Sequence, residues 1–252
     1  MIRVDRIYIA PVKALALTEM PRAYLDKPGI AGDRAFFIVT ADGRLFTQRD
    51  YGPLVQIRAG YDVGRGELKL AFPDGRLLKG VPELGEAAST PFWSERPVEG
   101  HVVRGEWNAA LSDFARQSLR LVKATRPGSS FDGFPLSLCS TASLQALAEA
   151  AGHETIDGRR FRQNIYVSGT SPHEEDGWIG REIRVGQAVL RVKVRDSRCA
   201  ITTHNPETGE IDMNTLKIIA SYRTDQPKEV NFGVYCTVVQ PGEAAAGDEV
   251  VP

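Results

Sequence analysis

Cys199 is the cysteine whose neighbours favour chemistry. It follows an apolar stretch at 190–194 that predicts a strand, and it ends the polar loop Arg195-Asp196-Ser197-Arg198. The two arginines beside it favour a thiolate, which is the form that attacks electrophiles and binds soft metals. Cys139 and Cys236 stand among apolar residues and are predicted to be small core residues. A lone cysteine after a strand is also a common structural residue, so both interpretations stay open.

Cationic side chains and a helix start form a second group. Arg160 and Arg162 flank Phe161, and alternate residues of a strand point to one face. Such a pair is suited to clamp a phosphate or a carboxylate. Ser140 and Thr141 begin a predicted helix, whose free N–H groups also favour an anion. The alternative for the arginine pair is a salt-bridged surface strand, and the alternative for Ser140 and Thr141 is an ordinary helix cap. Taken together with Cys199, these residues favour an anionic ligand that carries a soft metal.

The remaining cysteine and histidine spacings exclude several other classes of site. Three widely separated cysteines without a CxxC pair predict neither a disulfide scaffold nor a structural zinc site, and they favour a reducing cytoplasm. The four histidines lack the HExxH spacing of zinc enzymes. No four-cysteine ferredoxin pattern and no dinucleotide fingerprint is present. Electrons for a redox reaction would therefore come from a separate protein.

Composition describes an ordinary globular protein. The 252 residues are 42% hydrophobic, and 31 basic residues nearly balance 32 acidic ones, for a formal net charge of −1. No run of 18 apolar residues predicts a membrane-spanning helix. Without a block of positive charge, neither nucleic acid nor an anionic membrane is an expected partner.

Short strands dominate the pattern along the chain. Alternating apolar residues bounded by turn residues predict the strands, and apolar stripes with capping residues predict the helices. Residues 82–97 and the acidic run 174–176 are expected to be surface loops. The sequence therefore predicts a mainly β (α+β) protein with a few helices and a boundary near 126–130. The strands are expected at 4–10, 36–39, 54–61, 68–72, 119–124, 183–194 (a hairpin) and 232–239, and the helices at 107–117, 140–151 and 214–222.

Four ordered motifs resemble those of the MOSC domain family. They are Ser-Thr-Ala-Ser-Leu at 140–144, Arg-Phe-Arg-x-Asn-Ile at 160–165, Glu-Asp-x-Trp-x-Gly at 175–180, and Arg-Cys at 198–199 with Pro-x-Thr-Gly at 206–209. Segments 10–13, 29–36 and 46–49 are similar to the β-barrel domain that precedes MOSC in the branch that includes the mitochondrial amidoxime-reducing component. The resemblance implies a MOSC β-barrel at 126–252, packed against an N-terminal β-barrel-like domain at 1–125.

The resemblance also implies a molybdenum cofactor. In that branch the cysteine of the Arg-Cys motif binds molybdenum beside the dithiolene sulfurs of one molybdopterin, and Cys199 occupies that position. Asp176 matches an acid near the metal. The positions that match cofactor-binding residues are Lys13, Arg34, Ser140, Thr141, Arg160, Arg162, Asn164, Ser197, Arg198 and Tyr235.

The implied activity is the reduction of N-hydroxylated compounds such as amidoximes and hydroxylamino bases, with electrons from a separate reductase or small carrier. Neither the membrane anchor of the mitochondrial branch nor the pyridoxal-phosphate desulfurase domain of the sulfurases is expected, so pyridoxal phosphate binding enters only through the family. Ala14, Gln163 and His204-Asn205 depart from the family pattern. A sulfur carrier with a persulfide on Cys199, or a cofactor-storage protein, is the alternative function.

Overall fold

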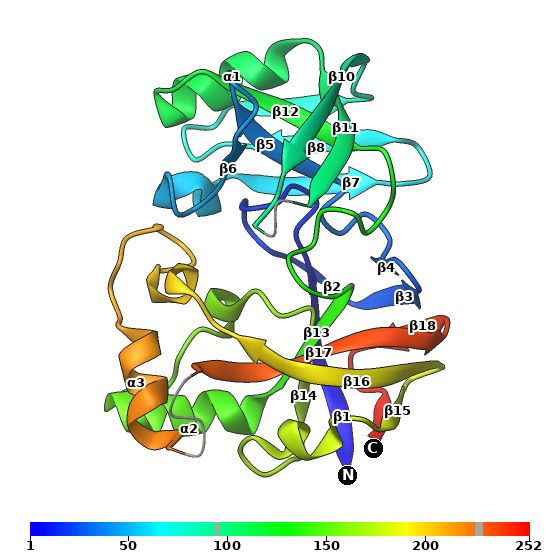
Figure 1. Ribbon diagram of the computed structural model, residues 1–252, viewed down its shortest axis with the longest axis vertical. Coiled ribbons are helices and arrows are strands. Elements are labelled where there is room, and N and C mark those ends of the chain that lie inside the picture. The colour runs from blue at the N-terminus through cyan, green and yellow to red at the C-terminus, as the bar shows by residue number, and fades with distance from the viewer. Residues whose placement is uncertain (94–95, 225–228) are drawn as a thin grey trace.

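The computed structural model describes residues 1–93, 96–224 and 229–252. Strands predominate over three α-helices in these parts of the chain. Two β-rich units lie one above the other, joined by several crossing segments (Figure 1). The predicted mainly β class with a few helices is confirmed.

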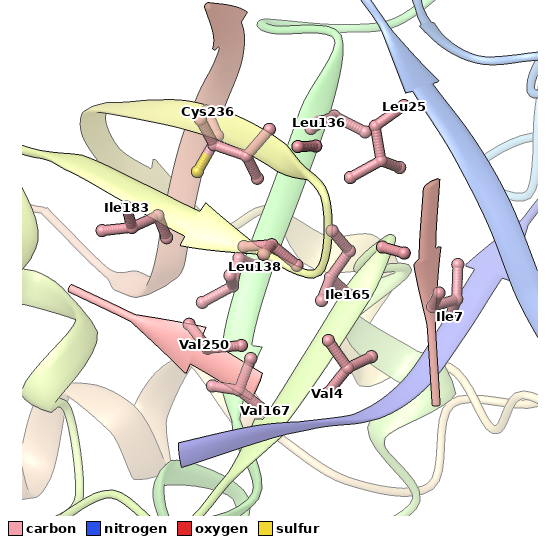
Figure 2. Packing of buried hydrophobic residues seen from close by; sticks show 14 of the residues in the cluster. Val4, Ile7, Leu25, Leu136, Leu138, Ile165, Val167, Ile183, Cys236 and Val250 are labelled. Atoms are coloured by element: carbon pink, nitrogen blue, oxygen red, sulfur yellow. The ribbon is translucent and has the colours of Figure 1, made fainter. Parts of the chain in front are cut away.

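The lower unit in Figure 1 is a closed barrel of seven strands. The first strand, β1 (Ile2–Ile9), closes it by pairing antiparallel with β14 (Ile165–Ser168) on one side and with β19 (Glu249–Val251) on the other. Figure 2 shows Val4, Leu138 and Ile165 gathered in its apolar core. In order around the barrel the strands are β14 (Ile165–Ser168), β13 (Leu136–Ser140), β17 (Asn231–Gln240), β16 (Ala188–Ser197), β15 (Glu182–Val185), β19 (Glu249–Val251) and β1 (Ile2–Ile9).

The beginning of the chain therefore lies in the barrel that otherwise consists of residues after 135. Strand β2 (Thr18–Met20) extends the sheet beyond β1, and β18 (Gly242–Ala245) pairs with β3 (Arg22–Asp26), which pairs with β4 (Gly29–Ile30). The division at residue 125 stays a prediction.

The upper unit contains a five-stranded and a three-stranded sheet with a common apolar core, which also includes helix α1 (Glu106–Ala115). The predicted loop 82–97 is wrong, because half of it, Leu84–Pro91, forms strand β10, while residues 94–95 lie outside the described residues. This edge strand has a single buried residue and many small or polar ones, so it lacks the usual alternation. The strands are β5 (Phe36–Thr40), β6 (Leu45–Phe46), β7 (Arg58–Asp62), β8 (Glu67–Ala71), β9 (Leu77–Gly80), β10 (Leu84–Pro91), β11 (Pro97–Val103) and β12 (Leu119–Ala124).

Helices α2 (Thr141–Ala151) and α3 (Thr215–Tyr222) pack together outside the lower barrel, with Leu147 and Ile219 in one apolar cluster. The predicted caps of α2 are confirmed: the Ser140 side chain accepts from the Ser143 N–H, and Gly152 is left-handed at the other end. None of the helices in the described ranges has the length and apolar character needed to cross a membrane.

Candidate functional site

A cavity of about 350 Å³ lies where the two units meet, and Cys199 is in its wall. Residues from both ends of the chain meet there because β1 leads directly from the lower barrel into the upper unit. Eight of the twelve predicted site residues line this cavity. They are Lys13, Arg34, Arg162, Asn164, Ser197, Arg198, Cys199 and Tyr235.

Cys199 stands at the end of β16, where the strand leaves its partner β17. Its carbonyl accepts from the Thr202 N–H, so it caps the short 3-10 helix η4 (Ala200–Thr203). Cys199 is partly exposed, whereas Cys139 and Cys236 are fully buried. Burial raises the pKa of the Cys139 thiol well above its usual value and that of Cys236 to about 12. Among the three thiols, Cys199 is the one placed to react or to bind a metal.

The two arginines that precede Cys199 in the sequence do not supply free positive charge. The Arg195 Nε lies 3.1 Å from a carboxylate oxygen of Asp176, and the Arg198 guanidinium is paired with Asp196. Arg198 also donates to the Phe161 carbonyl at 2.5 Å. Both guanidiniums are therefore neutralised by carboxylates.

Cations from distant parts of the sequence supply the charge instead. The Arg162 guanidinium donates to the Leu15 carbonyl at 2.9 Å and has no carboxylate partner among the described residues. Burial, together with the nearby charge of Arg34, lowers the pKa of Arg162 to about 10. Burial likewise lowers the pKa of Lys13. Within the described chain, five cations line the cavity against two carboxylates, Asp132 and Asp196, and a third carboxylate, Asp33, is paired with Arg34 from outside the lining.

Unusual backbone conformations also gather here. Residues 1–93, 96–224 and 229–252 include five non-glycine residues with a positive φ angle, and three of them line this cavity, namely Ala14 (74°), Arg34 (51°) and Arg162 (53°). Left-handed backbone is costly for residues with a side chain, and it is concentrated at functional sites. This strain is a second indication, independent of charge, that the cavity is a binding site.

Asp132 and Trp93 are cavity residues that sequence reasoning missed. Asp132 accepts from the Lys13 Nζ at 2.7 Å and from the Trp93 indole N–H at 2.6 Å. Burial alone would raise the pKa of Asp132, but the charges of Lys13 and Arg34 outweigh it, and the pKa is lowered. The Arg49 guanidinium lies 4.6 Å from the Trp93 ring centre. The only sequence feature that marks Asp132 is the Phe-Asp-Gly-Phe motif at 131–134, and this motif does not indicate a function.

The structure also places Asn164, Ser197 and Tyr235. The Asn164 carboxamide is held on both sides, donating to Tyr8 O and Asp33 and accepting from Ser137. Ser197 is exposed at the end of β16. Burial, followed by the charge of Asp196, raises the pKa of Tyr235, so its hydroxyl stays protonated and available as a donor.

Four predicted site residues lie outside the cavity, and the structure does not bring them to Cys199. Ser140 is buried as the α2 cap, and Thr141 faces another hollow. Arg160 forms two hydrogen bonds with Asp212, at 2.6 and 2.8 Å. Asp176 accepts from Arg195 and, at 2.5 Å, from Arg223. Their roles in cofactor binding or catalysis stay predictions.

Two predictions of local structure that involve these residues are wrong. The Arg160–Arg162 segment is not a strand: Gly158–Phe161 is the 3-10 helix η2, and Arg162 follows it in left-handed conformation. The two arginines are therefore not alternate residues on one face of a strand. The acidic run is not a solvated loop either, because the 3-10 helix η3 (Glu174–Trp178) buries Glu175 completely. Glu175 accepts from Ser143 and from the Ser140 N–H, which explains an acid inside the fold.

Comparisons with known proteins agree with this architecture. The MOSC N-terminal beta barrel domain matches residues 1–92, and the MOSC domain matches residues 107–251. The mitochondrial amidoxime reducing component 2 of Homo sapiens is 33% identical over 98% of this chain and 82% of its own length. Component 1 of Mus musculus is 27% identical over 98% of this chain and 81% of its own length.

A third relative belongs to a different functional class. The molybdenum cofactor sulfurase of Oryza sativa subsp. japonica is 23% identical over 92% of this chain but only 32% of its own length. The two domain matches follow each other in the order that the sequence motifs predicted. Because the MOSC match alone covers more than half of the chain, this protein belongs to the MOSC domain family and carries the MOSC N-terminal beta barrel domain.

Proposed function

We propose that this protein is a molybdenum cofactor-dependent reductase of N-hydroxylated compounds such as amidoximes and hydroxylamino bases. It would work in the cytoplasm, with electrons from a separate reductase or small carrier protein. One observation carries the proposal: the accessible thiol, Cys199, lines a cavity that is rich in cations, two of which, Arg49 and Arg162, have no carboxylate partner in the described structure. Relatives named as amidoxime-reducing components support the reaction class.

The cavity fits molybdopterin on chemical grounds. Molybdopterin carries a phosphate, and a buried guanidinium such as Arg162 is stabilised when an anion binds beside it. The thiolate of Cys199 is a soft ligand that suits molybdenum. Lys13, Arg34, Arg162 and Arg198 would hold the organic part of the cofactor. Asn164 is already fixed by its own hydrogen bonds, so it would orient the cofactor without reorganising.

In the proposed mechanism, the bound cofactor supplies the two-electron reduction of the N–O bond. The chain's own residues bind, orient and provide protons. Lys13 carries a proton on Nζ at the cavity wall, and its lowered pKa makes that proton easier to release. Asp132, 2.7 Å from this nitrogen, holds it in place. A sulfur carrier would need no clamp for an anionic pterin, so the cations favour the reductase over that alternative.

Metal analysis tests the proposal. Protein made in a host that synthesises molybdopterin is expected to contain close to one molybdenum per chain, and Cys199→Ala is expected to lose it. Cys236→Ala, at a buried thiol in the barrel core, is the matched control and should retain the metal. The loaded wild type should convert benzamidoxime to benzamidine with a reduced viologen dye.

Two results would contradict the proposal. Full retention of molybdenum in Cys199→Ala would remove Cys199 as the metal ligand. A fully loaded protein that turns over neither benzamidoxime nor a hydroxylamino base would point to cofactor storage.

A further inference from the structure

A second cavity of about 570 Å³ adjoins the cavity of Cys199. The two cavities share three lining residues, Gln48, Arg162 and Ile201. Residues of both units line the second cavity, among them Arg58 and Phe72 from the upper unit and Arg160 and His204 from the lower one. A molecule held in this second cavity would therefore reach the site of Cys199 at their common wall.

Gln48 stands at that common wall in an unusual state. Its side chain is buried, with 3% exposed, and its Oε1 has no hydrogen-bond partner among the described residues. Buried polar groups in native proteins are nearly always hydrogen-bonded, so an exception calls for an explanation. The buried Gln163 also has an Oε1 without a partner among the described residues, but its Nε2 donates to Asp196 at 3.0 Å and to the Phe232 carbonyl at 3.2 Å. Gln48 differs because neither end of its carboxamide forms a hydrogen bond within the described residues. A ligand at the junction of the cavities would satisfy Gln48.

The second cavity also carries excess positive charge. Four arginines line it against one carboxylate, Glu207. Arg159 is paired with Asp157 and Glu207, and Arg160 is paired with Asp212. Arg58 is exposed and has no ion pair or hydrogen bond from its side chain within the described ranges. Arg58 is therefore a cation with a free guanidinium, which is a ready partner for an anionic group.

The walls of this cavity are held in place by close backbone contact. Gly52, which begins the 3-10 helix η1 (Gly52–Gln56), faces Gly209 so closely that a Cβ atom on Gly52 would lie 2.0 Å from the Gly209 carbonyl oxygen. Gly209 has a φ of +81°, which also favours glycine. Gln56 donates to the Thr208 carbonyl across the same contact at 2.9 Å. The cavity is therefore formed before any ligand binds.

We propose that this second cavity is the substrate site of the reductase and that it takes N-hydroxylated molecules bearing an anionic group, a carboxylate or a phosphate. The inference rests on the proposed function and deepens it. The N-hydroxylated end would hydrogen-bond to Gln48 beside the cofactor cavity, and the anionic end would lie against Arg58. An uncharged substrate would use only the first of these contacts.

Substrate pairs that differ by one charge test the anionic end. For the molybdenum-loaded protein, kcat/KM for 4-carboxybenzamidoxime is expected to exceed that for benzamidoxime by about tenfold at low salt, and less at high salt. Arg58→Ala should lower this ratio about fivefold. Arg65→Ala, an exposed arginine in the β7–β8 turn, is the matched control and should leave it unchanged. The 5′-monophosphate of an N-hydroxylated nucleoside, compared with the nucleoside, shows whether phosphate serves as well as carboxylate.

A second variant tests the junction of the two cavities. Its expected result is a loss of kcat/KM without a loss of stability, which a purely structural role of Gln48 would not produce. Gln48→Met removes a carboxamide without a partner, so the thermal midpoint should stay the same or rise while kcat/KM for both benzamidoximes falls about tenfold. Gln163→Met removes two hydrogen bonds and is expected to lower the thermal midpoint. A lowered midpoint in Gln48→Met with unchanged kcat/KM would mean that Gln48 is a structural residue.

The outcomes separate the inference from the proposed function. If benzamidoxime is reduced but neither anionic group raises kcat/KM, or the Arg58→Ala and Arg65→Ala ratios are equal, the substrate site proposed here is wrong and the reductase stands. A gain with only one of the two anions supports the site and names its ligand. If loaded protein reduces none of these compounds, the proposed function itself is wrong; this site then fails with it.

Discussion

Two arginine-containing regions of the lower barrel differ in how their charges are matched. Around Asp176, the carboxylate accepts from both Arg195 and Arg223, and the charges are satisfied within the protein. Around Cys199, cations outnumber carboxylates and Arg162 has no carboxylate partner in the described chain. Both regions contain arginine and aspartate side chains, and each lies at a family motif. The difference teaches that the number of partners, rather than the presence of arginine, distinguishes an internal ion pair from a binding surface.

Thiol labelling gives the largest expected contrast between the Cys199 cavity and the rest of the barrel. In cofactor-free protein at pH 8, Cys199 is expected to react with iodoacetamide at least about 1000-fold faster than Cys139 or Cys236. With a pKa of about 12, Cys236 is a thiolate in only about one molecule in 10,000 at this pH. Peptide mass spectrometry gives the rates. Comparable labelling of Cys236 in the folded protein would contradict the difference in accessibility.

Breaking the Asp176 cluster should cost stability. Asp176→Asn removes the carboxylate from two arginines, one of them mostly buried, and is expected to lower the free energy of unfolding by about 3 kcal/mol. Urea denaturation measures this, and Glu154→Gln, at an exposed side chain, is the control. Molybdenum content is expected to stay near that of wild type. A change in molybdenum content without a loss of stability would place Asp176 in the cofactor site instead.

Replacing Arg162 is expected to have the opposite effect to Asp176→Asn, with stability kept and molybdenum lost. Its folded-state pKa of about 10 lies below the usual value of 12.5, so folding disfavours its charged form, and this cost is present below pH 10. Arg162→Met should therefore leave the cofactor-free protein as stable at pH 7, or more stable, while lowering molybdenum content about tenfold. Arg160→Met breaks the ion pair with Asp212 and should lower stability. Thermal unfolding measures the change in stability, and metal analysis measures the change in molybdenum content. Equal losses of stability in Arg162→Met and Arg160→Met would contradict the expected difference between the two arginines.

Much of the fold was predictable because local signals agree with it. Apolar spacing and caps located α2 between Ser140 and Gly152, and the Gly186-Gln187 turn located the β15–β16 hairpin. Strand β10 was missed because an exposed edge strand needs few apolar residues. The Arg160–Arg162 segment was assigned to a strand because alternation in three residues cannot distinguish a strand from a 3-10 turn. Eight predicted site residues reached one cavity, whereas Asp132, Trp93 and Gln48 carried no recognisable role in their motifs.

Residue order alone determined the mainly β class, the family motifs and the choice of Cys199 over two cysteines in apolar segments. Only the folded chain decided which charges remain unpaired. Lys13 meets Asp132, and Arg160 meets Asp212, across more than fifty positions of sequence. Coulomb interactions depend on distance through space and on burial, so the neighbours of an arginine in the sequence do not set its charge environment.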